Sequence, residues 1–292
     1  MGRSPSSRLV GRSLAWLLLC AGALVMLLPL AWMACVSLLS PEKAGAAITA
    51  GDLLEVFPWE PQWQNYSQAL REMGSDEWRG FRDALANSVV VTTLVCAATV
   101  LSSSLVGYAM ARVPFRGRRA TFLMMLGTMM LPGQVTMIPL FLLFRWLGWV
   151  DTLLPLIVPA FFGSAFFVFM YRQFIAQIPE ALLEAARIDG MGHMAIWWRV
   201  VLPLCQPVTA TCAVFTFLWT WNDFLAPLVY LHSDSQNTLA VALNSFRNQY
   251  GGLRNVHLLM AASVVTMIPC ILLFIAAQKH FVEGLTRGGV KG

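Results

Sequence analysis

The chain has 292 residues, of which 58% are hydrophobic and only 12% are charged. Its mean hydropathy of +0.65 lies far above that of ordinary soluble domains and indicates a chain that lies mostly in lipid. The formal net charge of +5 does not indicate a nucleic-acid partner, because the sequence offers no basic, aromatic-interleaved soluble surface.

Six apolar stretches are long enough to cross a bilayer as helices. A hydrocarbon core about 30 Å thick needs roughly 20 apolar residues in a helix. Stretches of this kind lie near residues 14–38, 86–110, 121–144, 152–171, 206–230 and 258–277. A signal peptide is the alternative for the first stretch, but that run is longer than an h-region of about 7–15 residues and lacks a clear cleavage site. The sequence therefore predicts an all-α, polytopic membrane protein with six transmembrane helices.

The distribution of basic residues predicts which side of the membrane each loop faces. Arginine and lysine residues precede the first span, follow the second, lie between the fourth and fifth, and end the chain. The loop after the first span is instead rich in acidic residues. Because basic residues are retained on the cytoplasmic side, we predict that both termini face the cytoplasm and that the inner arginines pair with anionic lipid and with partners.

The predicted spans divide the chain into three parts. Residues 1–85 comprise a cytoplasmic N-terminus, the first transmembrane helix and an external loop. Residues 86–278 form a compact transmembrane core that includes a long inner loop at 178–203. Residues 279–292 form a cytoplasmic tail.

The residue patterns of common catalytic and metal sites are missing from the sequence. A Walker A loop ends in GK[ST], and the lysines, Lys43, Lys279 and Lys291, do not stand in such a setting. The histidines have no HExxH spacing, there is no GxSxG elbow, and the cysteines lie in apolar spans where a thiol behaves as a small hydrophobe. We therefore expect no catalytic, cofactor-binding or metal-binding residues in this chain.

The inner loop carries a charged passage, Glu180 to Pro203, that is too long for a mere turn. Pro179 suits the first turn of a helix, and Glu184 is spaced to pair with Arg187 at i,i+3. Gly190 then ends the helix with a positive φ, and a second short helix leads to Pro203. The pattern predicts a helix, a turn and a helix along the membrane surface. An interfacial anchor helix is the alternative that composition alone favours.

The same passage carries a longer motif: EAA, three residues, glycine, nine residues, an aliphatic residue, one residue, and LP. Its members are Glu184, Ala185, Ala186, Gly190, Val200, Leu202 and Pro203. With this motif the chain resembles the permease subunits of bacterial ABC importers, although Val200 replaces the commoner isoleucine. Further stretches narrow the resemblance to carbohydrate-uptake permeases of the maltose type and second-subunit kind: PGQVTMIPLFLLFRWLGWVDT, IPEALLEAARIDG, WNDFLAPLVYL, NTLAVAL and FVEGLTRGGVKG. The resemblance covers most of the chain from about Asn65 onward.

The resemblance implies a type I ABC importer permease fold in the bacterial cytoplasmic (inner) membrane. The expected partners are a second permease subunit in a heterodimer, two ABC ATPase subunits, an extracytoplasmic solute-binding protein and membrane lipid. ATP and Mg²⁺ would be bound by the ATPase subunits, so this chain would be a non-catalytic subunit without a cofactor of its own. The expected substrate is a sugar or a related polyol.

The resemblance also implies that the loop 178–203 docks into a cleft of an ATPase subunit and couples its closure to alternating access. In this interpretation Ala185 and Ala186 permit close approach, Gly190 sets the angle between the two helices, and Glu184 is a polar partner or cap. The expected coupling residues are Glu184, Ala185, Ala186, Asp189, Gly190, Leu202 and Pro203.

Four residues within or near the spans are candidates for the transport path: Gln134, Trp219, Asn222 and Asp223. Polar groups at such positions usually face the bundle interior or an aqueous path, but they serve helix–helix hydrogen bonding equally well. The tryptophan would stack on a sugar or lie in an interfacial belt. The competing function is an ATPase-independent secondary transporter or channel, followed by a membrane-bound signalling or scaffold protein. Inverted repeats and intramembrane acid pairs would favour the transporter, and neither is evident in the sequence.

Overall fold

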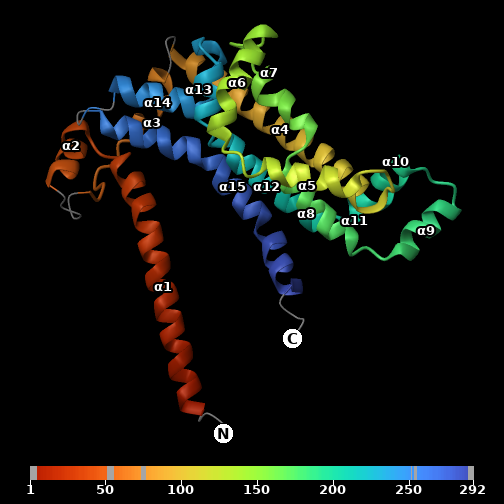
Figure 1. The fold of residues 1–292 in the computed structure, drawn as a ribbon. Helices are drawn as coiled ribbons and strands as arrows, with labels where there is room; N and C mark the ends of the chain where they lie inside the picture. Colours follow the sequence, from red (N-terminus) through yellow and green to blue (C-terminus); the bar gives the residue numbers. More distant parts are fainter. Residues whose placement is uncertain (1–4, 51–55, 74–76, 251, 253–254, 289–292) are drawn as a thin grey trace. The chain divides into compact units, whose positions relative to one another are not determined.

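A computed structural model describes residues 5–50, 56–73, 77–250, 252 and 255–288. Across these ranges the chain is helical and contains no strand, which confirms the predicted all-α class (Figure 1). The predicted tail of residues 279–292 is the end of a helix as far as Gly288, and residues 289–292 lie outside the described residues.

The α-helices follow one another along the chain with short 3₁₀ and π segments between some of them. Their bounds are α1 Pro5–Val36, α2 Pro41–Ala50, α3 Gln64–Glu72, α4 Glu77–Arg112, α5 Arg118–Thr128, α6 Gly133–Trp146, α7 Leu154–Ile157, α8 Ala165–Ala176, α9 Glu180–Ile188, α10 His193–Ile196, α11 Leu202–Leu204, α12 Gln206–Trp221, α13 Leu225–Tyr230, α14 Leu239–Tyr250 and α15 Val256–Gly288. The 3₁₀ segments are Val158–Phe162 and Asp234–Gln236, and the π segment is Trp197–Val201.

Within the described residues, four stretches are long and apolar enough to cross a membrane: Arg12–Val36, Gly80–Arg112, Leu154–Ala176 and Val256–Gln278. Two bent helix pairs pass the same test, α5 with α6 and His193–Leu204 with α12. Together they amount to six candidate spans if each bent pair counts as one. These positions overlap all six stretches expected from hydropathy.

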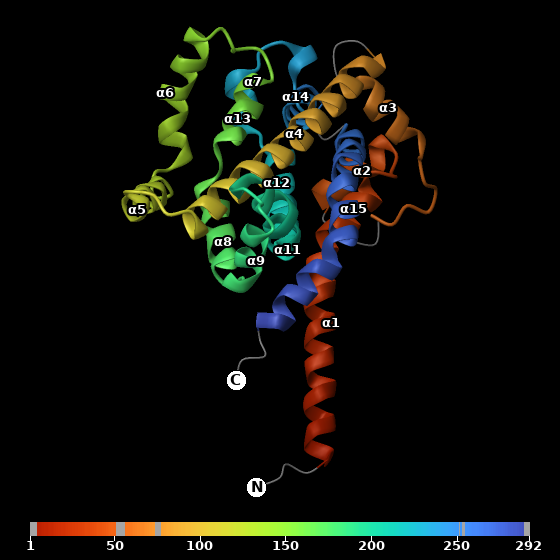
Figure 2. The ribbon, with the colours of Figure 1, turned by 90° about the vertical axis from the view of Figure 1, so that its right-hand side faces the viewer.

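The predicted span of residues 121–144 is sharply bent, because α5 and α6 meet at 99°. In Figure 2, α6 is seen along its length and α5 is seen almost end-on at its lower end. Pro132 is extended, with ψ of 131°, and a proline also disfavours helix in the residue before it. The Pro132–Gly133 step therefore ends one helix and begins the next.

The predicted span of residues 206–230 is also interrupted. It consists of α12, which ends at Trp221, and the short helix α13, which begins at Leu225. Asn222 leaves the helical region with φ of −95° and ψ of 3°. The polar pair Asn222 and Asp223 thus lies in a break between helices rather than inside a continuous span.

The helices group into two compact units. The first comprises residues 1–78 and 243–267, and the second comprises residues 79–242 and 268–292. The predicted boundary at 85/86 instead falls inside α4. Residues 243–267, which we expected in the core of 86–278, group with the N-terminal segment because Val256 packs with Val36, Leu39 and Ala44.

In the first unit, a buried amide holds the chain after α1 against α3. The side chain of Asn65 donates to the carbonyl oxygens of Ser37 and Leu39 at 2.9 and 2.8 Å. The Ser37 hydroxyl is in turn 2.7 Å from the Tyr66 hydroxyl. These bonds satisfy backbone carbonyls that leave the helix, so the turn keeps its shape where α1 ends.

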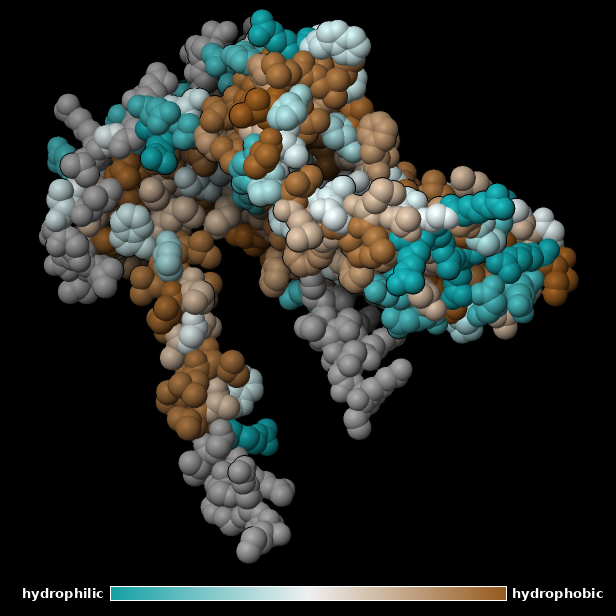
Figure 3. Space-filling view, in the orientation of Figure 1, coloured by the Kyte–Doolittle hydropathy of each residue, from teal (hydrophilic) through white to brown (hydrophobic). Residues whose placement is uncertain are grey.

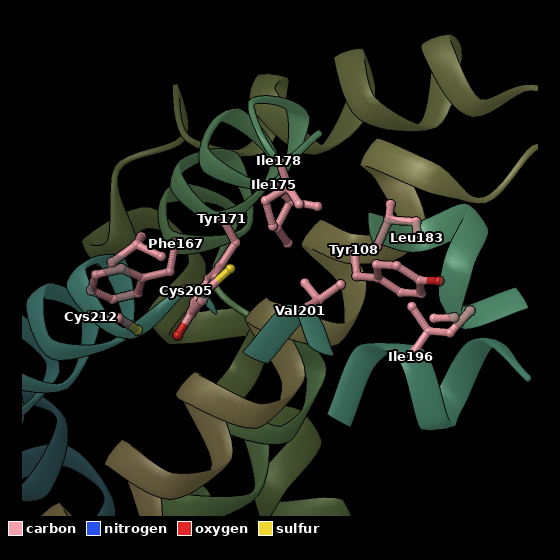
Figure 4. Close-up of a cluster of buried hydrophobic side chains, with 12 residues drawn as sticks. Tyr108, Phe167, Tyr171, Ile175, Ile178, Leu183, Ile196, Val201, Cys205 and Cys212 are labelled. Atoms are coloured by element: carbon pink, nitrogen blue, oxygen red, sulfur yellow. The ribbon is translucent and has the colours of Figure 1, made fainter. Parts of the chain in front are cut away.

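The second unit has a core in which α4, α8, α9 and α12 meet. Its buried side chains are Tyr108, Phe167, Tyr171, Ile175, Ile178, Leu183, Ala186, Ile196, Val201, Cys205, Val208 and Cys212 (Figure 4). Gly107 brings α4 close to α8, since a Cβ at this position would lie 2.6 Å from the Cβ of Tyr171. The Tyr171 hydroxyl donates to Thr209 at 3.0 Å and joins α8 to α12.

Candidate coupling site and transport path

The inner loop folds as the predicted helix, turn and helix. Helix α9 ends at Ile188, and Gly190 follows with φ of +78°, which confirms the expected positive value and suits a residue without Cβ. The amide of Met191 donates to the Ala186 carbonyl at 3.0 Å, and the amide of Gly190 donates to the Arg187 carbonyl at 3.0 Å. These bonds close the helix end before α10 begins.

The inner face of this loop packs on the core of its own unit. Leu183, Ala186, Ile196 and Val201 are all buried there, and Figure 4 shows Leu183 and Ile196 close to the ring of Tyr108. The loop is therefore anchored by apolar packing on the rest of the unit.

The outer face of the loop carries exposed apolar side chains. Ile188 is 86% exposed, and Leu182, Met194 and Trp198 are 47%, 64% and 55% exposed. In Figure 3, hydrophilic residues gather over the end of the second unit that carries α9 and α10. We use the term outer face for these four exposed apolar residues, Leu182, Ile188, Met194 and Trp198, which stand among polar residues of the loop.

The expected coupling residues do not all lie on the exposed side. Glu184, Ala185, Asp189, Gly190 and Pro203 are exposed, and Leu202 is half-buried. Ala186 is only 3% exposed and packs inward. The expectation that both alanines permit close approach of a partner is therefore corrected to Ala185 alone, because Ala186 faces the chain's own core.

The predicted pairing of Glu184 with Arg187 is wrong. Arg187 donates instead to Glu180 at 3.1 Å, and Arg112 donates to the other carboxylate oxygen of Glu180 at 2.5 Å. Glu180 precedes Arg187 by two helical turns and so lies on the same side of α9. Glu180 therefore binds both cations, Arg187 from its own helix and Arg112 from the end of α4.

Arg112 also caps the end of α8. Its guanidinium donates to the carbonyl oxygens of Ile175 at 2.9 Å and Ala176 at 3.3 Å, and to that of Ile178. The last carbonyls of a helix have no partner within the helix, and a cation there also complements the helix dipole. One turn earlier on α4, the Tyr108 hydroxyl is hydrogen-bonded to Nδ1 of His193 at 3.1 Å.

The four candidates for the transport path lie in different surroundings. Gln134 is exposed in the first turn of α6. Trp219 is 55% exposed and contacts the rings of Phe166, Phe167 and Phe215. The amide of Asn222 donates to the Leu218 carbonyl at 2.8 Å and approaches Sγ of Cys270 at 3.9 Å. Of the four, Asp223 alone lines the cavity described next.

Asp223 lines a cavity of about 130 Å³ between α4, α7, α12 and α13. One carboxylate oxygen accepts the backbone N–H of Ala226 at 3.3 Å. The polar residues around the cavity are Ser88, Thr92, Thr220, Asp223 and Thr238. Thr92 and Thr238 are 2% and 7% exposed, and neither hydroxyl has a hydrogen-bond partner among the described residues.

Sequence reasoning missed the hydroxyl residues of this cavity and the two α4 residues that contact the loop. A signal was present in each case. Ser88 and Thr92 are four residues apart in a predicted span, so they share one helix face. Arg112 stands at the predicted cytoplasmic end of the same span. The described residues contain no group of three or more His, Cys, Asp or Glu side chains placed to hold a metal ion.

Apolar spans and bent helix pairs are the features of a multi-pass membrane protein, and its inner loop has one packed and one exposed side. Residues 103–287 match the family model of the binding-protein-dependent transport system inner membrane component. The chain belongs to this family.

Relatives and a solved structure agree with this assignment. The chain is 41% identical over 206 residues to the arabinooligosaccharides transport system permease protein AraQ of Halalkalibacterium halodurans, covering 70% of this chain and 73% of that one. It is 32% identical to the melibiose/raffinose/stachyose import permease protein MelC of Bacillus subtilis, covering 81% and 84%. A crystal structure of a bacterial ABC transporter involved in the import of the acidic polysaccharide alginate contains a chain that is similar at 27% identity with a TM-score of 0.79, covering 96% of this chain and 99% of that one.

The family and these likenesses establish the fold as that of a type I ABC importer permease. The protein is a non-catalytic, multi-pass permease subunit of the inner membrane in a binding-protein-dependent transport system. The predicted family, fold class, localisation and non-catalytic role are confirmed.

Proposed function

We propose that this chain imports a sugar or related polyol as one half of a heterodimeric permease. Two ABC ATPase subunits would bind ATP and Mg²⁺ on the cytoplasmic side, and a solute-binding protein would deliver the substrate on the other side. The names of the relatives support a sugar, since they specify arabinooligosaccharides and melibiose, raffinose or stachyose. The arginine distribution supports an orientation with both termini in the cytoplasm.

The outer face of the loop is the observation that carries the coupling role. Protein interfaces commonly hold exposed apolar anchors in a polar rim, and the outer face has this composition, with Glu184 and Asp189 exposed beside it. We infer that this face, together with Ala185, docks into a cleft of an ATPase subunit. The inner face would then pass the movement of the ATPase to the core of the second unit.

The cavity at Asp223 is the part of the described structure that best fits a transport path. A carboxylate accepts hydrogen bonds from sugar hydroxyls, and the unpartnered hydroxyls of Thr92 and Thr238 offer both donors and acceptors. None of the described residues that line the cavity is basic. This composition fits a neutral sugar better than an anionic one. Gln134, Trp219 and Asn222 remain separate candidates at other points of the path.

The test is recovery of the ATPase subunit with purified permease, followed by uptake of labelled oligosaccharide into proteoliposomes. Ile188→Glu removes the most exposed apolar contact of the outer face. Burial of such a side chain contributes about 1.5–3 kcal/mol, so we expect ATPase binding to weaken about 10- to 100-fold. Gln177→Glu, an exposed position beside the loop, is the matched control and should bind normally.

The outcomes separate the competing functions. If Ile188→Glu and Gln177→Glu recover the ATPase equally, the outer face is not the docking surface. If wild-type permease transports sugar without ATP or an ATPase subunit, the chain works as a secondary transporter or channel instead. Asp223→Asn should lower uptake while ATPase recovery stays normal, and unchanged uptake would remove Asp223 from the path.

A further inference from the structure

The inner end of α4 contacts both helices of the coupling loop. Arg112 is bonded to Glu180 at the start of α9, and Tyr108 is bonded to His193 at the start of α10. Because Tyr108 and Arg112 are four residues apart, they lie on one face of α4. The two halves of the loop are therefore fixed to the same helical turn.

Arg112 is held more firmly than a surface arginine. Its side chain is 14% exposed, and its donors reach three carbonyl oxygens at the end of α8 as well as Glu180. A guanidinium has a planar, rigid set of donors, and hydrogen bonds to charged groups are stronger than neutral ones. Arg112 thus joins the ends of α4 and α8 to the beginning of α9.

The opposite half of α4 lines the Asp223 cavity with Ser88 and Thr92. From Thr92 to Arg112 the helix rises by about 30 Å. Three described helices are longer than 30 residues, and α1 and α15 contain Pro29 and Pro269, whereas α4 contains no proline. Since proline is a main cause of helix kinks, α4 reaches from the loop to the cavity without a proline-induced kink.

We propose that Tyr108 and Arg112 are positioning residues that make α4 the lever between the coupling loop and the Asp223 cavity. When the docked loop moves, the bonds to Glu180 and His193 pull the inner end of α4 with it. The close approach at Gly107, where a Cβ would lie 2.6 Å from that of Tyr171, makes α8 follow. This proposal rests on the proposed docking of the loop to an ATPase subunit.

The test measures sugar imported per ATP hydrolysed by the complete complex in proteoliposomes. In Arg112→Gln and Glu180→Gln the docking face is unchanged, so ATPase recovery should remain normal. The ratio of sugar to ATP should fall about 2- to 30-fold, the range expected when a contact that carries coupling is lost. Arg118→Gln is the control, because Arg118 is an exposed arginine of the same side and forms no ion pair with the described residues.

Two further variants separate coupling from simple stabilisation. Tyr108→Phe removes only the hydroxyl that contacts His193 and should lower the same ratio. Arg112→Glu and Glu180→Arg should each lower the ratio of sugar to ATP. The double variant with both substitutions restores an ion pair of opposite polarity and should recover part of that ratio. If Arg112→Gln does not assemble, Glu180→Gln and Tyr108→Phe decide the question.

The lever proposal would be overturned if Glu180→Gln and Tyr108→Phe assembled normally and imported as much sugar per ATP as the wild type. The lever would also be overturned if Arg118→Gln lowered the ratio of sugar to ATP as much as Arg112→Gln does. The effect would then come from the loss of any positive charge on the inner side. Failure of the docking proposal is a different result. It would appear as equal recovery of the ATPase subunit by Ile188→Glu and Gln177→Glu, or as wild-type permease that transports sugar without ATP.

Discussion

Gly190→Val tests whether the turn of the coupling loop depends on a left-handed backbone. Gly190 has φ of +78°, and a Cβ built at this position meets nothing within 4 Å. The substitution therefore causes no clash, and its cost comes from the backbone. A residue with Cβ in this region loses about 1–2 kcal/mol, and a β-branched residue belongs at the upper end of that range.

This strain falls on a turn closed by two backbone hydrogen bonds from Gly190 and Met191. If the strain is relieved by opening the turn, about 1–2 kcal/mol lowers the ratio of native to open turn by a factor of roughly 5–30. ATPase recovery and ATP-dependent uptake should fall by up to this factor. Membrane insertion should survive, because no spanning helix is changed. Gly190→Asn should be milder, since asparagine tolerates positive φ.

Gly192→Val is the matched control for this prediction. Gly192 lies two residues further along the same turn, has φ of −73°, and also has open space at its Cβ. It receives the same side chain without the left-handed strain. Equal ATPase recovery and uptake for the valine variants at positions 190 and 192 would refute the reasoning, because backbone conformation is the main difference between them.

Three other predictions follow from particular positions. Gly107→Ala places a Cβ 2.6 Å from a side chain of α8. It should lower the free energy of unfolding of the detergent-solubilised protein by about 1–3 kcal/mol. Gly127→Ala is the control and should leave it unchanged, because a Cβ there meets nothing within 4 Å. The pKa of Asp151 is lowered to about 2 by the Ser233 hydroxyl and by the backbone N–H groups of the two residues at 232–233. The stabilising contribution of this carboxylate is therefore present above about pH 4 and is lost as the pH falls towards about 2. In Asp151→Asn the unfolding temperature should depend less on pH in that window. Cysteines at Gly117 and Asn248 should be labelled by an impermeant thiol reagent only from the inside and only from the outside respectively, and labelling of Gly117→Cys in intact cells would contradict the orientation.

Ser75, a second outside position for such labelling, lies outside the described residues. The expected orientation therefore depends on Asn248 for its external marker in the described part of the chain. Asn248 is exposed in α14, so its labelling is limited by the side of the membrane and not by burial. The two positions together distinguish the predicted orientation from the inverted one.

Local rules predicted the parts of the site that depend on neighbours in the sequence. Gly190 has positive φ because a helix end needs it, and this requirement is visible in the sequence as a glycine after a helical pattern. The pairing of Arg187 could not be found in this way. Its partner Glu180 is fixed by Arg112, which is 68 residues away along the chain. An i,i+3 rule compares only residues on one helix.

The transport-path candidates Trp219 and Asp223 lie in different surroundings for a related reason. Trp219 and Asp223 are four residues apart, which would place them on one face of a continuous helix. Helix α12 ends at Trp221, however, so Asp223 follows a break and lines the cavity while Trp219 packs against Phe166 and Phe167. The bend at Pro132–Gly133 was, by contrast, readable from the sequence as a proline–glycine step inside an apolar run.

The two faces of the coupling loop favour a docking element over an interfacial anchor. An anchor helix has one apolar stripe that enters lipid and one charged face that remains in water. In α9 the principal apolar stripe, which includes Leu183 and Ala186, is already buried in the protein and is not available to lipid. The exposed apolar residue Ile188 instead stands beside Asp189 on the other side. Lipid would not accept that mixture without burying a charge, whereas a protein cleft with complementary polar groups would. The loop is therefore better suited to a protein partner than to the membrane surface.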